Sequence, residues 1–220
     1  MDGTLLDLAF DNHFWLSHII EHHAQLNDQT TEDSLACLQP KFNAAKGTLA
    51  WYCTDYWSEQ LGFSIAEQKR QQAHRIALRK DSLAFLQWLD QHNIPCWLVT
   101  NAHPDTIEIK LAQTHIGSYF EAIYCSHELG FAKEQPEFWH KLQAMQAFDP
   151  STSVFVDDTL SVLGAAKDYG VERLFHIDQP DSTQPPVESS VFEQIRFLGE
   201  LEKPISQWLA PLAQTMPEES

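Results

Sequence analysis

The feature that most constrains the fold of this chain is a change of hydrophobic rhythm near Lys80. From about residue 11 to 78, apolar residues recur at three- and four-residue spacing, a pattern that indicates helices. After Lys80, helix-length segments alternate with short apolar runs, which is typical of a parallel α/β sheet. The sequence therefore predicts an α/β core into which an all-helical block is inserted.

The helical block contains four predicted helices. Asp11 is expected to cap the first, and Thr30 with Asp33 resembles a capping box that opens the second. Pro40 is expected to end or kink that second helix, because proline removes a backbone donor. The third helix covers residues 49–61, and the fourth follows it.

The second part of the chain contains four apolar runs of strand length, separated by predicted helices. In open α/β sheets the ligand crevice lies at the carboxyl ends of strands, so the residues after Val99 and Val156 are the expected site. From Asp178 onward prolines interrupt the pattern, and a surface helix with an acidic tail is expected. The predicted strands are 94–99, 122–125, 154–156 and 174–177, and the last of these is expected to be the final strand. The predicted domains are a core of 1–10 and 80–178, a helical block of 11–79 and a C-terminal extension of 179–220.

The net charge of the chain limits the classes of ligand that it can bind. With 14 Lys and Arg against 31 Asp and Glu, the net charge is −17. Such a surface repels nucleic-acid backbones, which argues against nucleic-acid binding. A small anionic substrate would need a local positive site built from a metal ion, a lysine or helix N-termini.

The cysteines and the apolar runs indicate where the protein works. The four cysteines form no Cys-x-x-Cys pair, so reduced thiols are a better interpretation than a zinc site or a disulfide framework. No apolar run approaches the roughly 20 residues that a membrane helix requires. We expect a protein of the cytoplasm with no membrane partner.

Polar residues follow the predicted strands at the expected site. Thr100 and Asn101 follow one strand, and Lys133 stands three residues before a proline. Asp157 and Asp158 follow the next strand. Taken singly, the acidic pair could cap a helix, the Thr-Asn pair could open one, and the lysine could lie on the surface. The chain itself begins with Met1-Asp2-Gly3-Thr4-Leu5-Leu6-Asp7.

In this order, the four segments resemble the motifs of the haloacid dehalogenase superfamily of phosphatases. The first motif of that family reads Asp-x-Asp-Gly-Thr, and its first Asp is the nucleophile. Met1 stands at the x and Asp2 at the second Asp, so the nucleophile is expected one position before Met1. The resemblance implies a Rossmann-like parallel sheet and the helical insert known as a C1 cap.

The resemblance also implies a role for each matching residue. Asp2 would be the acid/base, Thr100 would bind a phosphoryl oxygen, and Lys133 would offset negative charge. Mg²⁺ would be the cofactor, held by the nucleophile and the acids that follow the later strand. The implied sets are catalytic Asp2, Thr100 and Lys133; the substrate-binding amides of Gly3 and Asn101; and metal ligands Asp2 (through its carbonyl), Asp157 and Asp158.

The segments after the first motif and around residues 51–62 look closer to one branch of the superfamily, the bacterial nucleotidases that act on GMP and IMP. This resemblance implies a purine nucleoside 5'-monophosphate as substrate and an aspartyl-phosphate intermediate. Tyr52, Tyr56 and Trp57 could stack on the purine. The alternative is that these rings fill the core of the helical cap, as aromatic residues do in small helical domains.

The beginning of the chain departs from the family pattern. The first core strand is expected to be missing, so two central strands would lose their shared neighbour. We expect an N-terminal truncation, and a chain that is inactive until an apolar strand and an Asp precede Met1. The alternative function is a catalytically silent protein that binds phosphate monoesters.

Overall fold

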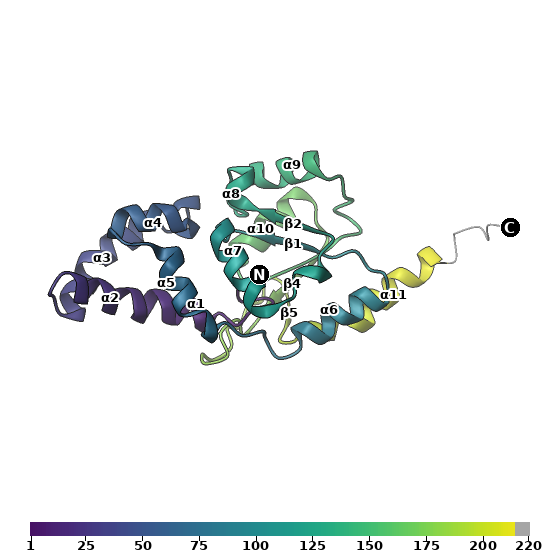
Figure 1. Ribbon diagram of the computed structural model, residues 1–220. Coiled ribbons are helices and arrows are strands. Elements are labelled where there is room, and N and C mark those ends of the chain that lie inside the picture. The colour runs from purple at the N-terminus through teal and green to yellow at the C-terminus, as the bar shows by residue number, and fades with distance from the viewer. Residues whose placement is uncertain (214–220) are drawn as a thin grey trace.

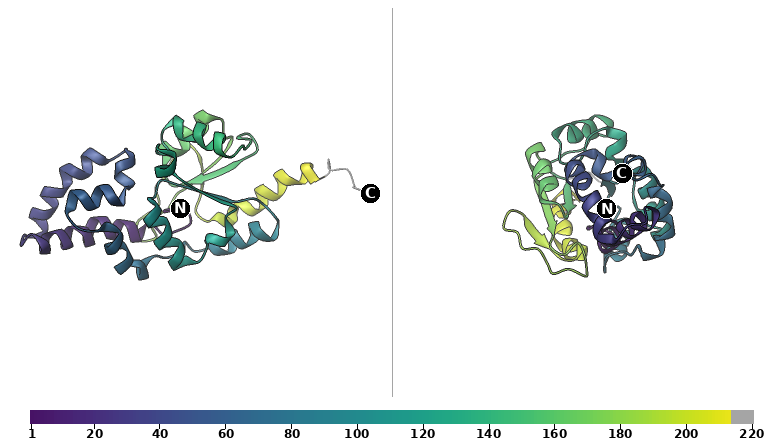
Figure 2. Two further views of the ribbon diagram at one scale, coloured as in Figure 1. Left: turned by 45° about the horizontal axis from the view of Figure 1, so that its top comes forward. Right: turned by 90° about the vertical axis from the view of Figure 1, so that its left-hand side faces the viewer.

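The computed structural model describes residues 1–213 and shows an α/β core with a helical cap beside it (Figure 1). The acidic tail predicted at the C-terminus falls on residues 214–220, outside the described part. Within the described part, no helix has both the length and the apolar composition needed to cross a membrane. Helices α2 to α5 lie together at one end of the molecule, and α6 and α11 lie side by side at the other (Figures 1 and 2).

The cap confirms the helical block that the sequence predicts. Ser64 accepts a hydrogen bond from the amide of Glu67 at the start of α5, and Thr30 accepts one from Asp33 at the start of α3. The elements of the cap are α1 (Ala9–His13), a π-helical turn (Phe14–His18), α2 (Ile19–Leu26), α3 (Thr31–Ala45), a 3₁₀ helix (Leu49–Tyr52), α4 (Thr54–Leu61), α5 (Ile65–Gln71) and a 3₁₀ turn (Ala73–Arg75).

Two of the predicted boundaries in the cap are wrong. Helix α1 begins at Ala9, whose amide donates to Asp7 Oδ1 at 3.0 Å, so Asp11 lies inside the helix and does not cap it. Pro40 lies inside α3, which continues to Ala45, so the prediction that the helix ends at Pro40 is wrong, and the alternative of a kink stays a prediction. A helix can continue past a proline where packing outweighs the lost hydrogen bond, and Leu38 and Phe42 are both buried on the face of α3 that packs into the cap.

The core alternates helices and strands along the chain, as predicted. Helix α7 has Pro104 in its first turn, and Thr159 precedes α10 as its N-cap residue. The elements of the core are α6 (Ser82–Gln91), β1 (Trp97–Thr100), α7 (Pro104–Thr114), a 3₁₀ turn (Gly117–Tyr119), β2 (Ala122–Cys125), α8 (Ser126–Leu129), α9 (Pro136–Met145), β3 (Val154–Asp157), α10 (Leu160–Tyr169), β4 (Arg173–Ile177), β5 (Glu193–Ile195), a 3₁₀ helix (Leu198–Leu201) and α11 (Glu202–Ala213).

The strands are all parallel and form two small sheets. Strand β1 pairs with β2, and β3, β4 and β5 pair in that order. The prediction that β4 is the final strand is wrong, because β5 adds a further parallel strand, with Ile195 opposite Ile177. Helix α11 also contributes buried Ile205 to the core, so it is more than a surface helix.

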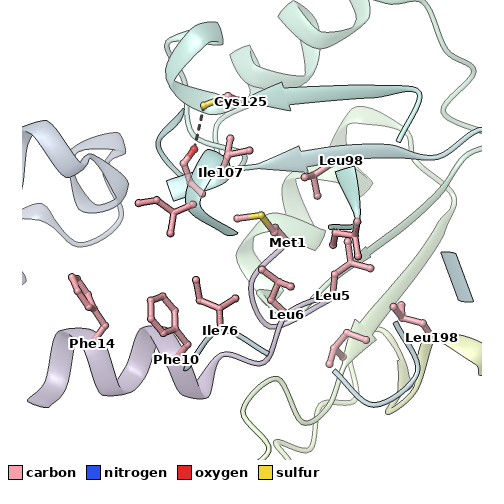
Figure 3. Packing of buried hydrophobic residues seen from close by; sticks show 14 of the residues in the cluster. Met1, Leu5, Leu6, Phe10, Phe14, Ile76, Leu98, Ile107, Cys125 and Leu198 are labelled. Carbon is pink, nitrogen blue, oxygen red and sulfur yellow. Dashed lines mark hydrogen bonds between the residues drawn. The ribbon is translucent and has the colours of Figure 1, made fainter. Parts of the chain in front are cut away.

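The sequence predicts that two central strands lack their shared neighbour. In the described structure, strands β1 and β3 are indeed not paired with each other. A cavity of about 510 Å³ lies between them, lined mostly by apolar side chains of both strands and of α6 and α9. Met1 and Leu5 line the same cavity, and Figure 3 shows them among the buried side chains, which include Leu98 of β1. The space between the two sheets is thus an apolar one.

The N-terminal segment forms the passage between core and cap. Residues 1–6 make a tight turn in which the amides of Leu5 and Leu6 donate to the carbonyl of Met1. The amide of Asp7 then donates to the carbonyl of Ala77, and the amide of Arg79 donates to that of Leu5. The chain therefore enters and leaves the cap through two adjacent segments, directly beside the carboxyl ends of β1 and β3.

Candidate active site

The predicted site residues meet in one pocket of about 340 Å³ between the core and the cap. Strand β1 is parallel to β2 and β3 is parallel to β4, and residues at the carboxyl ends of β1 and β3 line this same pocket. The N-terminal turn adds Met1 and Asp2 from one side, and the cap adds an aromatic face. The predicted residues that line the pocket are Asp2, Thr100, Asn101, Lys133, Asp157 and Asp158.

Gly3 was expected to bind substrate through its amide, but it is not among the residues that line the pocket. Its amide donates to the carbonyl of Leu6 at 2.8 Å, so the amide is not free for a phosphoryl oxygen. Its φ of +69° is a conformation that glycine adopts at little cost, and a Cβ here would overlap the carboxylate of Asp158. Glycine at this position allows the N-terminal turn to approach Asp158 closely.

Asn101 connects the end of β1 to the segment that carries Lys133. Its Oδ1 accepts hydrogen bonds from Ser126 Oγ at 2.6 Å and from the Lys133 amide at 2.8 Å. Its Nδ2 donates to Glu134 Oε2 at 2.8 Å. Thr100, the last residue of β1, is buried, and its Oγ1 accepts from the Ala102 amide at 3.1 Å. These bonds hold the end of β1 in one conformation.

Lys133 and Asp157 form a buried ion pair. The Nζ of Lys133 lies 2.5 Å from Oδ2 of Asp157, and Oδ1 of Asp157 accepts from the Thr159 amide at 2.9 Å. Burial opposes the charge of Lys133, but Asp157 outweighs it and raises the pKa of the ammonium above its ordinary value. Both oxygens of Asp157 are therefore engaged within the protein.

Among the described residues, Asp158 forms no ion pair of this kind. Burial and the neighbouring Asp157 raise the pKa of its carboxyl to about 7, although Lys133 and the amino group of Met1 act in the opposite direction. A buried carboxylate is costly unless a cation offsets its charge. Asp158 is thus the acid of this pocket that gains most from a bound cation.

The donor set suits a hard divalent ion such as Mg²⁺. Mg²⁺ prefers oxygen ligands, keeps several waters and takes few protein ligands. Asp2, Asp157 and Asp158 all line this pocket, and each offers oxygen donors. Among the described residues, no three His, Cys, Asp or Glu side chains are grouped so as to hold a metal ion. A metal here would therefore rely on backbone and water oxygens besides Asp157 and Asp158.

Two lysines of the pocket region were not identified from the sequence. Lys110 of α7 lies 2.7 Å from Oδ1 of Asp2 and 2.5 Å from Oδ2 of Asp11. Lys69 of α5 lies 3.0 Å from Oδ1 of Asp11. Burial raises the pKa of Asp11, but the two lysines outweigh it and lower the value to about 2. No local pattern indicates this cluster, because its members come from three separate helices.

Of the three rings expected at the aromatic face of the cap, Tyr52 lines the pocket, whereas Tyr56 and Trp57 do not. Trp57 is 1% exposed, and its ring is enclosed by Trp15, Phe42 and Trp51. The interpretation of Trp57 as a stacking residue is therefore wrong, and the alternative of a cap core holds for it. The rings of the cap that line the pocket are those of Trp15, Phe42, Trp51 and Tyr52.

Tyr52 also connects the cap to the core. Its hydroxyl donates to Glu134 Oε1 at 3.0 Å, while the other oxygen of Glu134 accepts from Asn101. Burial and the charge of Glu134 raise the pKa of the Tyr52 hydroxyl well above its ordinary value. The hydroxyl thus stays protonated and acts as a donor, so that the cap is held over the end of β1.

A known protein family and known proteins resemble this chain over most of its length. The family model described as haloacid dehalogenase-like hydrolase matches residues 1–170. The GMP/IMP nucleotidase YrfG of Escherichia coli (strain K12) is 35% identical over 182 residues, which are 83% of this chain and 82% of the relative. The same share and identity hold for the GMP/IMP nucleotidase YrfG of Shigella flexneri.

Solved structures show the same fold at low sequence identity. A HAD phosphatase from Thermococcus onnurineus has a TM-score of 0.78 at 18% identity, covering 93% of this chain and 94% of its own. The putative HAD-hydrolase YfnB from Bacillus subtilis, described as bound to magnesium, has a TM-score of 0.63 at 16% identity, covering 94% and 96%. At these identities the likeness concerns the fold.

Proposed function

Because the chain belongs to the haloacid dehalogenase-like hydrolases, we propose that it hydrolyses nucleoside 5'-monophosphates, with GMP and IMP preferred. One observation carries the proposal: Asp2, Thr100, Lys133 and the Asp157–Asp158 pair surround a single pocket whose opposite wall is aromatic. The identity with a GMP/IMP nucleotidase supports the choice of substrate. The four free cysteines of the described structure support a cytoplasmic location, where thiols stay reduced.

The proposed reaction begins with attack of an aspartate on phosphorus. This nucleophile would be the first Asp of the family's Asp-x-Asp-Gly-Thr motif, a position that aligns one residue before Met1. The attack would give an aspartyl phosphate that water then hydrolyses.

The chain's own residues would bind the phosphate and move the proton. Lys133 places a positive charge at the pocket, and Thr100 stands at the end of β1 as a donor to a phosphoryl oxygen. The backbone at Asn101 would donate to a second oxygen. Asp2 would protonate the leaving 5'-oxygen and then accept a proton from the attacking water, so one carboxyl serves as both acid and base.

Mg²⁺ is the proposed cofactor. The pocket would hold it through Asp158, the carbonyl of Asp2, the nucleophile, and Asp157 directly or through water. When bound, the ion would neutralise charge that otherwise repels an anionic nucleophile from the phosphate dianion. The raised pKa of Asp158 supports this assignment, since it marks a carboxyl that lacks a compensating cation.

The test uses an extended form of the protein, in which an apolar strand ending in Asp precedes Met1. We expect Mg²⁺-dependent release of phosphate from GMP and IMP, with a higher kcat/KM than for UMP or CMP. An Asp158→Asn variant should lose on the order of 100-fold or more in turnover, since a catalytic metal supplies several kcal/mol. Equal turnover with and without Mg²⁺, or activity of the variant equal to that of the parent, would contradict the proposal.

A further inference from the structure

Asp2, the proposed acid/base, is in contact with a buried lysine that no motif includes. Lys110 is 1% exposed, and its Nζ lies 2.7 Å from Oδ1 of Asp2. The other contact of this ammonium is Oδ2 of Asp11, at 2.5 Å. Asp11 in turn contacts Lys69 through its second oxygen. The four groups form one chain of alternating charge, Asp2–Lys110–Asp11–Lys69.

Burying this chain of charged groups costs free energy of desolvation. Lysine side chains are rarely buried, and a buried ion pair often stabilises a fold no better than apolar residues of similar volume. The Nζ of Lys110 nevertheless lies within ion-pair distance of both Asp2 and Asp11. The lysine therefore fixes the position of one carboxylate oxygen of Asp2.

The position of Lys110 is itself fixed from the cap side. Asp11 belongs to α1 and Lys69 to α5, both in the cap, whereas Lys110 belongs to α7 of the core. Lys69 is also held over the rings of Phe14 and Trp15, at 4.6 and 5.8 Å from their centres. The ammonium of Lys110 thus lies between a carboxylate anchored in the cap and the carboxylate of Asp2.

We propose that Lys110 is a positioning residue for Asp2 in the hydrolysis of phosphate monoesters, an inference that rests on the proposed function. Lys110 holds Oδ1 of Asp2 and leaves Oδ2 as the oxygen that exchanges a proton with the leaving group. Asp11 keeps the ammonium in place when the cap is packed against the core. Lys110 touches neither substrate nor phosphorus in this scheme, so its contribution depends on how much proton transfer the reaction needs.

Leaving groups of different basicity separate this role from a merely structural one. An alkyl phosphate, such as a nucleoside 5'-monophosphate, releases a basic alkoxide that requires protonation as the bond to phosphorus breaks. p-Nitrophenyl phosphate releases a stable anion that needs little protonation. Loss of the positioning of Asp2 should therefore slow the alkyl substrate selectively, whereas a distorted pocket should slow both.

The experiment compares kcat/KM for GMP and for p-nitrophenyl phosphate in the extended form, in Lys110→Met and in a control, Lys167→Met, which removes an exposed lysine of α10. General acid catalysis typically accelerates a reaction about 100-fold or more. In Lys110→Met, kcat/KM should therefore fall about tenfold or more for GMP and less than about threefold for the aryl ester. The control should keep both rates. Thermal melts report whether each variant is folded.

Equal losses on the two substrates, or no loss on GMP, would overturn the role of Lys110 and leave the proposed function standing. A parent protein that hydrolyses neither ester would overturn the proposed function and this role with it. If Lys110→Met does not fold, Lys110→Arg carries the test, because it keeps the charge but displaces the donor. In Lys110→Arg, kcat/KM should fall more for GMP than for the aryl ester. An equal fall for both substrates would again contradict the role of Lys110.

Discussion

At the scale of single residues, Asp158 connects the stability of the protein to pH. The pKa of its carboxyl is raised from 3.8 to about 7 in the folded protein, so the folded state binds a proton more tightly than the unfolded state. Stability that depends on this proton is present below about pH 4. It is lost as pH rises through the folded pKa, near 7.

We therefore predict that, in a chelating buffer, the wild-type melting temperature falls relative to that of Asp158→Asn as pH rises from 5 to 8. Asparagine resembles the neutral acid and carries no buried charge at any pH. Added Mg²⁺ should raise the melting temperature of the wild type at pH 8 and leave that of the variant unchanged. Parallel pH profiles for the two proteins would show that Asp158 is not the uncompensated acid.

Some of these residues could be found from the sequence, and others could not. Thr100 ends β1 and Asp158 follows β3, so the alternation of apolar runs along the chain is enough to identify their region. Lys133 follows α8, and its spacing of three residues from Pro136 identified it. The contact of Lys110 with Asp2 is invisible to such reasoning, because α7 meets the N-terminal turn only in the folded chain. Gly3 shows the converse, since its place in a motif indicated an amide donor, whereas its amide is used within the turn.

At the scale of secondary-structure elements, the cap should divide into rings that bind substrate and rings that hold the cap together. Trp51 lines the pocket, whereas Trp57 is enclosed. We predict that Trp51→Ala in the extended form lowers the preference for GMP over UMP by about tenfold, because a stacked base contributes about 1 to 3 kcal/mol.

Trp57→Ala is the matched substitution for that experiment. It should lower the stability of the cap by about 3 to 5 kcal/mol, as the loss of a large buried side chain does. The readout is the ratio of kcat/KM values beside a thermal melt for each variant. An unchanged ratio in Trp51→Ala, or a stable Trp57→Ala, would reverse these assignments.

There is a physical reason why some elements could be predicted from the sequence and others could not. Strand β2 was predicted at its observed bounds, because its apolar run is separated from the helices around it. Strand β5 contains a single apolar residue, Ile195, and its three residues are held by pairing with β4, a long-range contact that no local pattern reports. Helix α3 continues past Pro40 for a similar reason, since its buried face is stabilised by the rest of the cap.

At the scale of the whole molecule, strand β1 of one sheet and strand β3 of the other lie on either side of an apolar cavity of about 510 Å³. We predict that the extended form melts at a higher temperature than the 220-residue chain. An apolar strand placed between β1 and β3 would bury side chains and pair with both edges. A gain of about 2 kcal/mol corresponds to roughly 4–8 °C in a chain of this size. Identical melts would show that the cavity does not receive a strand.

The central proposal is that the described pocket is an aspartate-based phosphatase site whose nucleophile is the first Asp of the family motif, which aligns one position before Met1. The most direct measurement is phosphate release from GMP with Mg²⁺ by three proteins: the extended form, the same form with Asn in place of the nucleophilic Asp, and the 220-residue chain. We predict turnover by the first protein alone, while the others bind GMP without hydrolysing it. Turnover by the 220-residue chain or by the Asn form at the rate of the extended form would contradict the claim.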